Sequence, residues 1–400
     1  MLKKTKPGVN RREFVKGTSS ALVLAAASTV FPTFAIGAQA KVKLGVLLPF
    51  SGTYAKLGSH ILDAMKMRIA QNGGKLGGRS VDYVVIDSEM KVKESTSRTN
   101  KLMQKEKADF LIGPVHSGIG MNMARMVKNK KVILVVPNAG ANQITGQFCA
   151  PNIFRTSFTS WQTAFPAGKA MLKAGHKKVV LLYWNYAFGK QTATAFQESF
   201  LAGGGKIVAD MPTPFPKTEF QSFFTKVAAL KPDAVFTFYS GGGAIKFMKD
   251  YAAAGLQGKI PLWGTFLTEG TAKAAGSASE GIISTLHYSS ELRNATNQKF
   301  KVDFKKASGD NADVFAIQGY DAGSLLIQGM QAVRGDTGAH KDLIMAMENS
   351  VIDSPRGEMS FSKSHNPIQN IYLREVRGGK NEVIGIAEKA LADKAVGCKA

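Results

Sequence analysis

The sequence predicts an α/β fold made of two lobes, each built on a parallel, doubly wound sheet. From residue 41 onwards, short apolar runs alternate with amphipathic helical patterns. The runs are almost continuously apolar, which is typical of strands covered on both faces. Because strands that alternate with helices usually pair in parallel, a doubly wound sheet is favoured. The alternation begins again near residue 179, and the combined number of strands exceeds one small sheet, so two lobes are expected.

The expected elements follow in order along the chain. The first set has strands at 42–48, 81–86, 109–112 and 132–136, and the second has strands at 179–183, 206–211, 234–239, 260–264 and 282–286. Ile61, Leu62, Met65 and Ile69 recur at helical spacing after the first strand. Further helices are expected near 191–201, 220–230, 244–254, 297–306, 314–333 and 341–349, and a terminal pair of strands near 358–361 and 370–375.

The first 40 residues have the pattern of an export signal. Arg11 and Arg12 precede a weakly apolar stretch at 21–36 and the small residues of Ala38-Gln39-Ala40. This arrangement predicts a twin-arginine signal cleaved after Ala40, so the mature chain should begin at Lys41 and work in the periplasm. The alternative is a membrane-spanning or buried helix, but a span needs roughly 20 unbroken apolar residues. The run is interrupted by Ser28, Thr29, Pro32 and Thr33.

The composition is strongly basic. Removing residues 1–40 lowers the formal charge from +23 to +18. Such a charge suits nucleic acid, an anionic surface or anionic small molecules. The lysines are scattered singly and in pairs, however, and no stretch combines aromatic and basic residues as RNA-binding segments do. We therefore expect a solvated basic surface and no nucleic-acid partner.

Cysteine and histidine usage predicts one disulfide and no metal. Cys149 and Cys398 are the two cysteines, and an oxidising compartment lets such a pair close. The six histidines are dispersed, without the paired spacing of a zinc site.

Gly-rich loops follow several of the expected strands. They lie at 49–52, 113–118, 137–142 and 240–243. Open α/β sheets bind ligands at the carboxyl ends of their strands, where free backbone N–H groups can hold a carboxylate. Gly and Asn also simply make turns, but four such loops in one structural position favour a binding cleft.

Sequence motifs of catalysis are missing. No Gly-Lys precedes Ser or Thr, no Ser has the glycines of a nucleophile elbow, and no Gly-x-Gly-x-x-Gly opens a helix. His116 and Ser117 are adjacent on one loop, where a base and a nucleophile seldom face each other. We therefore expect no enzyme activity and no cofactor.

Aromatic residues follow the first strand of the second set. Tyr186 and Phe188 could stack on a planar or apolar ligand, or could pack into the core of their own lobe. For Trp184, core packing is the favoured interpretation.

A series of short motifs runs in one order along residues 41–390. They are KLGVLLPFSG at 43–52, Gly58, IGP at 112–114 with Ser117, PNAG at 137–140, FRT at 154–156, YAFG at 186–189, KPDAV at 231–235 and QGYDA at 318–322. Together they resemble the leucine/isoleucine/valine-binding family of periplasmic solute-binding proteins.

The resemblance implies a type I periplasmic-binding fold, with two Rossmann-like lobes joined by a hinge of three crossings. It places crossings near Phe158, His287 and Ile371. It implies a first lobe of 41–158 and 288–370, and a second lobe of 159–287 and 371–400. It further implies a monomer that closes on a small carboxylate and delivers it to an ABC permease.

The resemblance also implies a set of site residues. The serine that binds the ligand carboxylate falls on Ser117, and His116 is a secondary candidate donor. Loop residues Asn138, Ala139, Gly140 and Ala141 correspond to those that hold the polar head. Walls of the site fall on Tyr186, Phe188, Gly242, Phe266 and Phe315. In amino-acid binders an aromatic residue precedes Gly58, but here the residue is Leu57.

The second departure from the family concerns the ligand's ammonium group. The acid that holds it in amino-acid binders falls near Phe266, although Glu269 is three residues away. An unpaired buried ammonium costs several kcal/mol, so an aromatic carboxylate such as a benzoate or hydroxycinnamate derivative is favoured. Branched-chain amino acids are the alternative, and whether Glu269 points into the cleft separates the two. A ligand sensor for a separate receptor is a third possibility.

Overall fold

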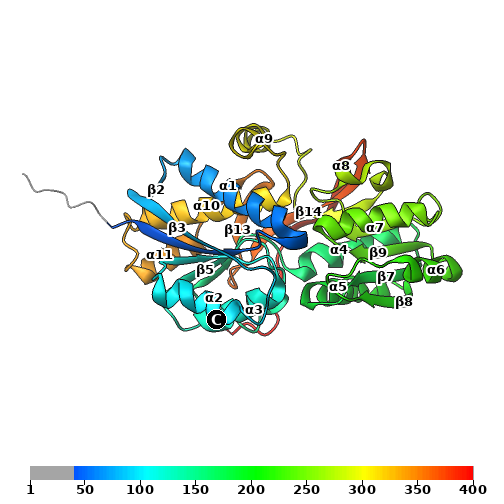
Figure 1. Cartoon of the computed structure of the whole chain (residues 1–400), viewed down its shortest axis with the longest axis horizontal. Helices are drawn as coiled ribbons and strands as arrows, with labels where there is room; N and C mark the ends of the chain where they lie inside the picture. The colour runs from blue at the N-terminus through cyan, green and yellow to red at the C-terminus, as the bar shows by residue number, and fades with distance from the viewer. Residues whose placement is uncertain (1–39, 400) are drawn as a thin grey trace, which may run out of the picture. The chain divides into compact units, whose positions relative to one another are not determined.

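The computed structural model describes residues 40–399, and the expected export signal lies outside them. Within the described range, no helix has the length and apolar character needed to cross a bilayer. The chain forms two sheets of mostly parallel strands, which confirms the predicted α/β class (Figure 1).

The first sheet has the strand order β2-β3-β1-β4-β5-β6. Its strands are β1 Val42–Leu48, β2 Lys75–Leu76, β3 Arg79–Asp87, β4 Phe110–Ile112, β5 Ile133–Val136 and β6 Ile153–Arg155. All neighbours pair in parallel except β2 and β3, which are antiparallel. The parallel strands β1, β4, β5 and β6 are almost wholly buried, as their continuous apolar character predicts.

Helices cover both faces of this sheet. They are α1 Ala55–Gln71, α2 Ser95–Asn100, α3 Ser117–Val127, α10 Val314–Ala332 and α11 His340–Glu348, and α9 Ala295–Ser308 packs on the outside of α1. Ile119 and Met123 of α3 share one apolar cluster with Leu134 of β5, whereas α1 and α10 belong to a second cluster. A side chain at Gly319 would put its Cβ 2.0 Å from the backbone oxygen of Ile61, so the close packing of α10 on α1 requires this glycine.

The second sheet has the order β12-β13-β14-β11-β10-β9-β7-β8, and β15 pairs with β14. Its strands are β7 Lys178–Trp184, β8 Lys206–Thr213, β9 Ala234–Phe238, β10 Leu262–Thr265, β11 Ile283–Leu286, β12 Ile352–Ser354, β13 Gly357–Phe361, β14 Pro367–Arg377 and β15 Lys380–Leu391. The strands from β7 to β11 pair in parallel, and β14 joins them antiparallel.

Helices again flank the parallel strands of this sheet (Figure 1). They are α4 Ser160–Lys173, α5 Ala187–Ala202, α6 Gln221–Leu230, α7 Gly241–Ala253 and α8 Ala272–Ala275. Helix α4 begins at a capping box, in which Thr159 and Gln162 each accept a backbone hydrogen bond from the other. This cap fixes where the chain leaves the first sheet and enters the helices of the second.

The chain passes between the two sheets at three places. Residues 156–159 connect β6 to α4, and the segment from His287 connects β11 to α9. Strand β14 is the third connection, since it pairs near Ile368 with β13, whose neighbour β12 packs against α10 of the first sheet, and with β11 from Tyr372 onwards. The boundaries of the lobes within this arrangement stay a prediction.

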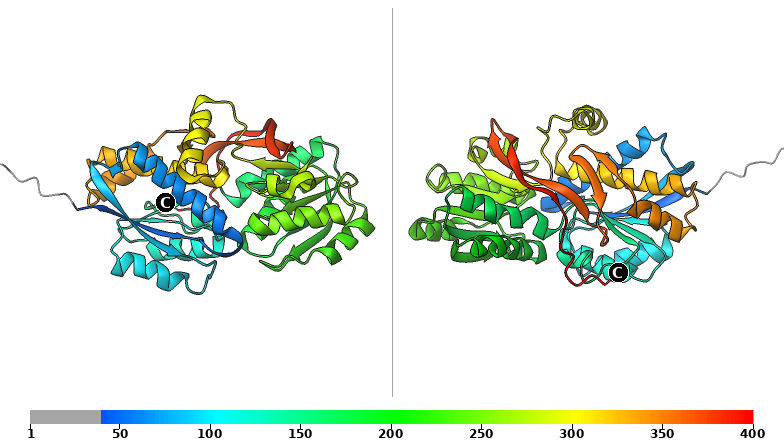
Figure 2. Two further views of the ribbon diagram at one scale, coloured as in Figure 1. Left: turned by 45° about the horizontal axis from the view of Figure 1, so that its top comes forward. Right: turned by 180° about the vertical axis from the view of Figure 1, so that it is seen from behind.

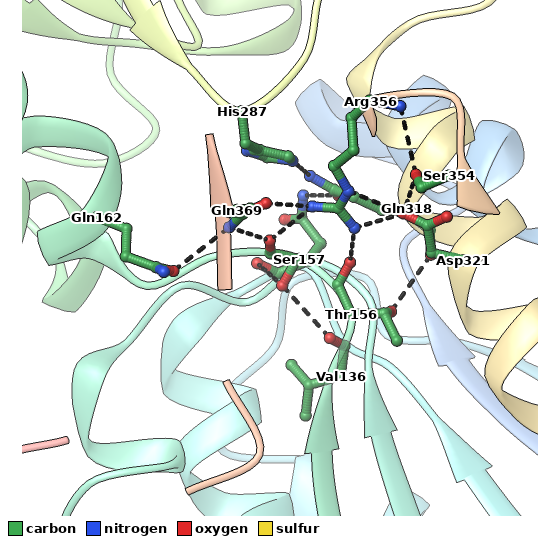
Figure 3. A network of polar contacts seen from close by, with 11 residues as sticks. Val136, Thr156, Ser157, Gln162, His287, Gln318, Asp321, Ser354, Arg356 and Gln369 are labelled. Atoms are coloured by element: carbon green, nitrogen blue, oxygen red, sulfur yellow. Dashed lines mark hydrogen bonds and ion pairs between the residues drawn. The ribbon is translucent and has the colours of Figure 1, made fainter. Parts of the chain in front are cut away.

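A buried ion pair between Arg356 and Asp321 links the first and third of these connections to helix α10 (Figure 3). Arg356 Nε donates to Asp321 Oδ2 at 2.9 Å, and both side chains are almost wholly buried. The guanidinium also donates to the backbone oxygens of Thr156 and Ser157 and to the side chain of Gln369. The first connection, the third connection and helix α10 therefore meet at one side chain.

The last described residues pass helix α5 of the second sheet and then return to the first sheet. Lys394 pairs with Glu198 of α5 at 2.6 Å, and Cys398 forms a disulfide with Cys149, which follows β5. The two Cα atoms lie 5.5 Å apart, within the range that a disulfide requires. The right view of Figure 2 shows the red segment of the last described residues beside the cyan helices of the first sheet. The predicted pairing of the two cysteines is thus present.

Removing this disulfide should destabilise the protein. Cys398→Ala is expected to lower the free energy of unfolding by about 2–5 kcal/mol, because the cross-link restricts the unfolded chain. Denaturant unfolding of the oxidised mature protein is the measurement, and the Cys149→Ala/Cys398→Ala double variant should lose the same amount. Equal midpoints for oxidised and reduced wild type would contradict the expectation.

Candidate functional site

A cavity lies where loops from both sheets meet. Its lining residues follow the carboxyl ends of seven parallel strands, with one more from the first turn of α10. They are Tyr54, Leu57, Val115, Asn138, Gly140, Phe158, Tyr186, Phe188, Phe238, Ser240, Phe266 and Phe315. The cavity volume is about 20 Å³, close to the roughly 10–15 Å³ that one water molecule needs. A ring-bearing ligand would therefore need the surrounding side chains to move apart.

Five of the twelve lining residues are phenylalanines. Their rings pack against one another, with the centroids of Phe188 and Phe238 4.5 Å apart and those of Phe158 and Phe266 4.7 Å apart. Tilted and edge-on arrangements of this kind suit a further aromatic ring. A Cβ at Gly140 would lie 2.4 Å from the ring of Phe188, so the loop after β5 can approach this wall only without a side chain.

Phe266 occupies a strained backbone conformation at the cavity. Its φ is +61°, a left-handed value that bulky residues seldom adopt. Such strain costs on the order of 1–3 kcal/mol and is often found at binding sites. Here it follows the end of β10 and accompanies a ring that is 2% exposed and lines the cavity.

The polar groups of the cavity are few and uncharged. Asn138 contributes an amide and Ser240 a hydroxyl, whose oxygen is buried without a hydrogen-bond partner. The hydroxyls of Tyr54 and Tyr186 lie 3.1 Å apart and pair with each other. No lysine, arginine, aspartate or glutamate belongs to the lining within the described residues.

His116 and Ser117 begin helix α3 just outside the cavity lining. The Nδ1 atom of His116 accepts from the backbone N–H of Gly118 at 3.1 Å, so the imidazole caps the helix. Its ring stacks on Tyr186 with centroids 4.8 Å apart, and burial lowers its pKa to about 4. The hydroxyl oxygen of Ser117 is buried and has no protein partner, which leaves it available to a ligand.

Glu269 is engaged elsewhere and does not line the cavity. Its Oε2 atom accepts from Arg374 Nη1 at 2.6 Å, and both side chains are buried. Burial raises the pKa of Glu269, while the adjacent guanidinium opposes that shift. Because the carboxylate already has a cationic partner, the cavity has no acid with which to hold an ammonium group.

Three of the expected site residues lie behind the cavity or at its edge. The backbone oxygens of Ala139 and Ala141 accept from the buried guanidinium of Arg155, which fixes the loop after β5. Gly242 is exposed at the start of α7, beside Thr53. The other expected residues outside the lining are His116 and Ser117, described above. The lining includes Leu57, Asn138, Gly140, Tyr186, Phe188, Phe266 and Phe315.

Five lining residues are not among those that the sequence singles out: Tyr54, Val115, Phe158, Phe238 and Ser240. Val115 and Ser240 belong to the Gly-rich loops that were expected to form a binding cleft, although neither residue was named as part of the site. Phe158 was expected only as a crossing residue. Tyr54 follows the loop 49–52, and Phe238 ends a buried strand, where an aromatic residue is indistinguishable from core.

Several hydrogen bonds join loops of the first sheet to loops of the second beside the cavity. The backbone N–H of Gly243 donates to Thr53 Oγ1 at 3.3 Å. The Gln191 side chain accepts from the backbone of Asn142 at 2.8 Å and donates to Gln143 at 2.6 Å. With the Tyr54–Tyr186 pair, these contacts close the two sides over the cavity.

Comparison with known proteins gives one consistent result. Residues 41–381 match the model of a family described as periplasmic binding protein. A similar relative is Leu/Ile/Val-binding protein homolog 6 of Brucella melitensis, which is 30% identical over 362 residues, covering 88% of this chain and 92% of the relative.

Two solved structures with bound ligands are also similar. One is an ABC transporter solute-binding protein of Rhodopseudomonas palustris in complex with benzoate, with a TM-score of 0.88, 50% identity and coverage of 90% of this chain and 100% of that one. Another protein from R. palustris is in complex with 4-hydroxybenzoate, with a TM-score of 0.83, 28% identity and coverage of 88% and 98%.

The neutral imidazole of His116 should make stability depend on pH. Its pKa is about 4 in the folded state and about 6.5 when unfolded. Below pH 6.5 the unfolded chain therefore binds the extra proton first, and stability falls by roughly 3 kcal/mol as the pH drops towards 4. His116→Asn keeps a capping residue and should flatten this dependence in urea unfolding measured at several pH values.

The wild type, measured in parallel, is the reference for the slope. Identical slopes for His116→Asn and the wild type would show that His116 is not the group responsible.

Proposed function

The chain belongs to the periplasmic binding protein family, and on that premise we propose that it is the substrate-binding component of an ABC importer for aromatic carboxylates. The ligand would be a benzoate or a related acid such as a hydroxycinnamate derivative, bound between the two lobes. The observation that carries the proposal is a cavity walled by five phenylalanines and free of charged side chains. Such a site suits an apolar ring and excludes a second charge.

Uncharged donors can hold the carboxylate. The unpartnered hydroxyl of Ser117 begins α3, whose N-terminus carries the positive end of the helix dipole. The amide of Asn138 and the hydroxyl of Ser240 lie in the lining itself. Hydrogen bonds to a charged acceptor are stronger than those to a neutral one, so a few such donors can offset the loss of hydration.

An α-amino acid is a poorer guest for this cavity. Its ammonium would be buried without an acid, since Glu269 is paired with Arg374. An unpaired buried charge costs several kcal/mol. The benzoate found in the R. palustris neighbour agrees with this reasoning. The name of the Brucella relative favours branched-chain amino acids as the alternative, and sensing for a separate receptor uses the same fold.

The remaining parts of the proposal follow from family membership and, for export, from the N-terminal sequence. The partner would be the membrane permease of an ABC transporter, which receives the ligand from a monomeric binding protein. We propose binding without catalysis and without a cofactor. Export would use the twin-arginine signal at Arg11 and Arg12, with cleavage after Ala40. Strand β1 begins at Val42, so cleavage at that point would leave the sheet whole.

Ligand binding should depend on both the ring and the carboxylate. Ser117→Ala is expected to weaken benzoate binding roughly tenfold or more, because a hydrogen bond to a charged group contributes about 1.5–3 kcal/mol. Phe188→Ala should weaken all ring-bearing acids because apolar burial and ring packing are lost together. Calorimetric titration with benzoate, 4-hydroxybenzoate, a hydroxycinnamate and leucine is the measurement.

Two variants outside the cavity are matched controls. Ser88→Ala removes another buried hydroxyl that has no partner, and Phe196→Ala removes another buried ring of helix α5. Both should bind like the wild type if they fold. Tight leucine binding with no response to any aromatic acid would overturn the proposal in favour of the amino-acid alternative.

Export should require the paired arginines. Replacing Arg11 and Arg12 with lysine is expected to leave the precursor in the cytoplasm, since the twin-arginine system reads that pair. Cell fractionation followed by N-terminal sequencing checks this, and Lys3→Arg/Lys4→Arg should be exported normally with Lys41 first. A wild-type protein that stays unprocessed in the membrane would refute the signal assignment.

A further inference from the structure

A short chain of amides leads from the cavity to the second connection between the sheets. Asn138 lines the cavity, and the structure places its Nδ2 atom as the donor to Oε1 of Gln318 on α10, at 2.7 Å. The other end of the Gln318 amide lies 3.2 Å from the Nε2 atom of His287. Figure 3 shows Gln318 beside His287. Gln318 and His287 are fully buried, and the Nδ1 atom of His287 has no partner.

This chain of three side chains can run in two directions. An amide turned by 180° exchanges its oxygen and its NH2 group at the same two positions. In one direction, which is how the structure places the amide atoms, Asn138 donates to Gln318, Gln318 donates to Nε2 of His287, and the imidazole proton is on Nδ1. In the other, His287 Nε2–H donates to Gln318, Gln318 donates to Asn138, and Nδ1 carries no proton.

The imidazole holds one proton, so only one direction is present at a time. Burial together with the nearby Arg356 and Arg374 lowers the pKa of His287 well below its ordinary value, which keeps the ring neutral. The proton on one ring nitrogen therefore decides which atoms of Gln318 and Asn138 face each other. It also decides which end of the Asn138 amide is left for the cavity.

The two directions differ in whether the buried imidazole N–H has an acceptor, and in which end of the Asn138 amide faces the ligand. With the proton on Nδ1, a buried N–H has no acceptor, and the oxygen of Asn138 faces a ligand carboxylate, so lone pairs oppose each other. With the proton on Nε2, both amides are turned by 180° from their placement in the structure. The imidazole N–H then donates to Gln318, and the Asn138 NH2 group can donate to the carboxylate. A buried donor left without a partner is costly, so the second direction fits this site.

We propose that His287 and Gln318 are positioning residues that turn the NH2 group of Asn138 towards the cavity, and thereby select a carboxylate over a carboxamide. The proposal rests on the proposed function, since it takes a carboxylate as the ligand. It adds a determinant of specificity that does not itself touch the ligand. The selection is made by the tautomer of a buried histidine at the connection between the sheets.

The tautomer is measurable directly. In the full mature protein labelled with ¹⁵N-histidine, the resonances of His287 are identified by their absence from the spectrum of His287→Phe. The expected result is a proton on Nε2 and a bare Nδ1. A proton on Nδ1 would overturn the proposal, whatever ligand the protein binds.

The second measurement is the ratio of affinities for benzoate and benzamide. Gln318→Met removes the amide that orients Asn138 while keeping a side chain of similar length. The Asn138 amide can then turn its oxygen to the NH2 group of benzamide, so the preference for benzoate should fall about tenfold or more. Gln331→Met, an exposed glutamine of the same helix, is the matched control and should keep the wild-type ratio.

Failure of the two proposals can be told apart. If wild-type protein binds neither benzoate nor benzamide, the proposed function fails and the tautomer alone decides the orientation of the chain. If wild type binds benzoate and folded Gln318→Met keeps the wild-type ratio, the selection by the amide chain is overturned while the proposed function stands. A thermal melt shows whether Gln318→Met is folded.

Discussion

The arrangement of the whole site depends on the buried ion pair between Arg356 and Asp321. A buried pair stabilises a protein only when its remaining polar atoms are satisfied. Arg356 meets that condition with five hydrogen bonds, which match the five N–H groups of a guanidinium. Oδ2 of Asp321 also accepts from Ser354, whereas its buried Oδ1 has no protein partner. Two of the Arg356 hydrogen bonds end on the backbone of Thr156 and Ser157, directly before the cavity residue Phe158. The same contact that holds the sheets together therefore also places one wall of the site.

The site combines a rigid apolar wall with polar atoms that carry no charge. Ring packing and the strained backbone of Phe266 fix the wall, while Arg155 fixes the loop of Asn138 from behind. The carboxylate of Glu269 does not enter the cavity because it forms a buried ion pair with Arg374. Recognition of an anion is thus left to oriented neutral donors, whose direction matters more than their number. This makes the orientation of a single amide a determinant of what binds.

Much of the fold could be predicted from the sequence because its parallel strands are nearly continuous apolar runs that alternate with amphipathic helical patterns. The strand expected at 42–48 is β1, and the Gly-rich loops lie at strand ends as expected. Strand β15 escaped prediction because it lies at a sheet edge with exposed apolar residues such as Ile386, which is 54% exposed.

The site was predictable only where a loop motif or the family resemblance pointed to it. Arg356 sits alone in a turn, and nothing local distinguishes it from a solvated arginine. Pairings between Gln318, His287 and Asn138 join residues far apart in the chain, and such contacts are set by tertiary packing rather than local sequence.

The disulfide between Cys149 and Cys398 has a topological consequence. The two cysteines are separated by 249 residues in the sequence, and their bond closes this part of the chain into a covalent ring. The ring contains all of the second sheet and the three connections. A single cut anywhere inside this ring opens it without releasing a fragment. Exposed loop tips are where proteases cut folded chains, and for a protein that works outside the cytoplasm such a nick would leave one covalently continuous molecule, with both walls of its cavity still attached.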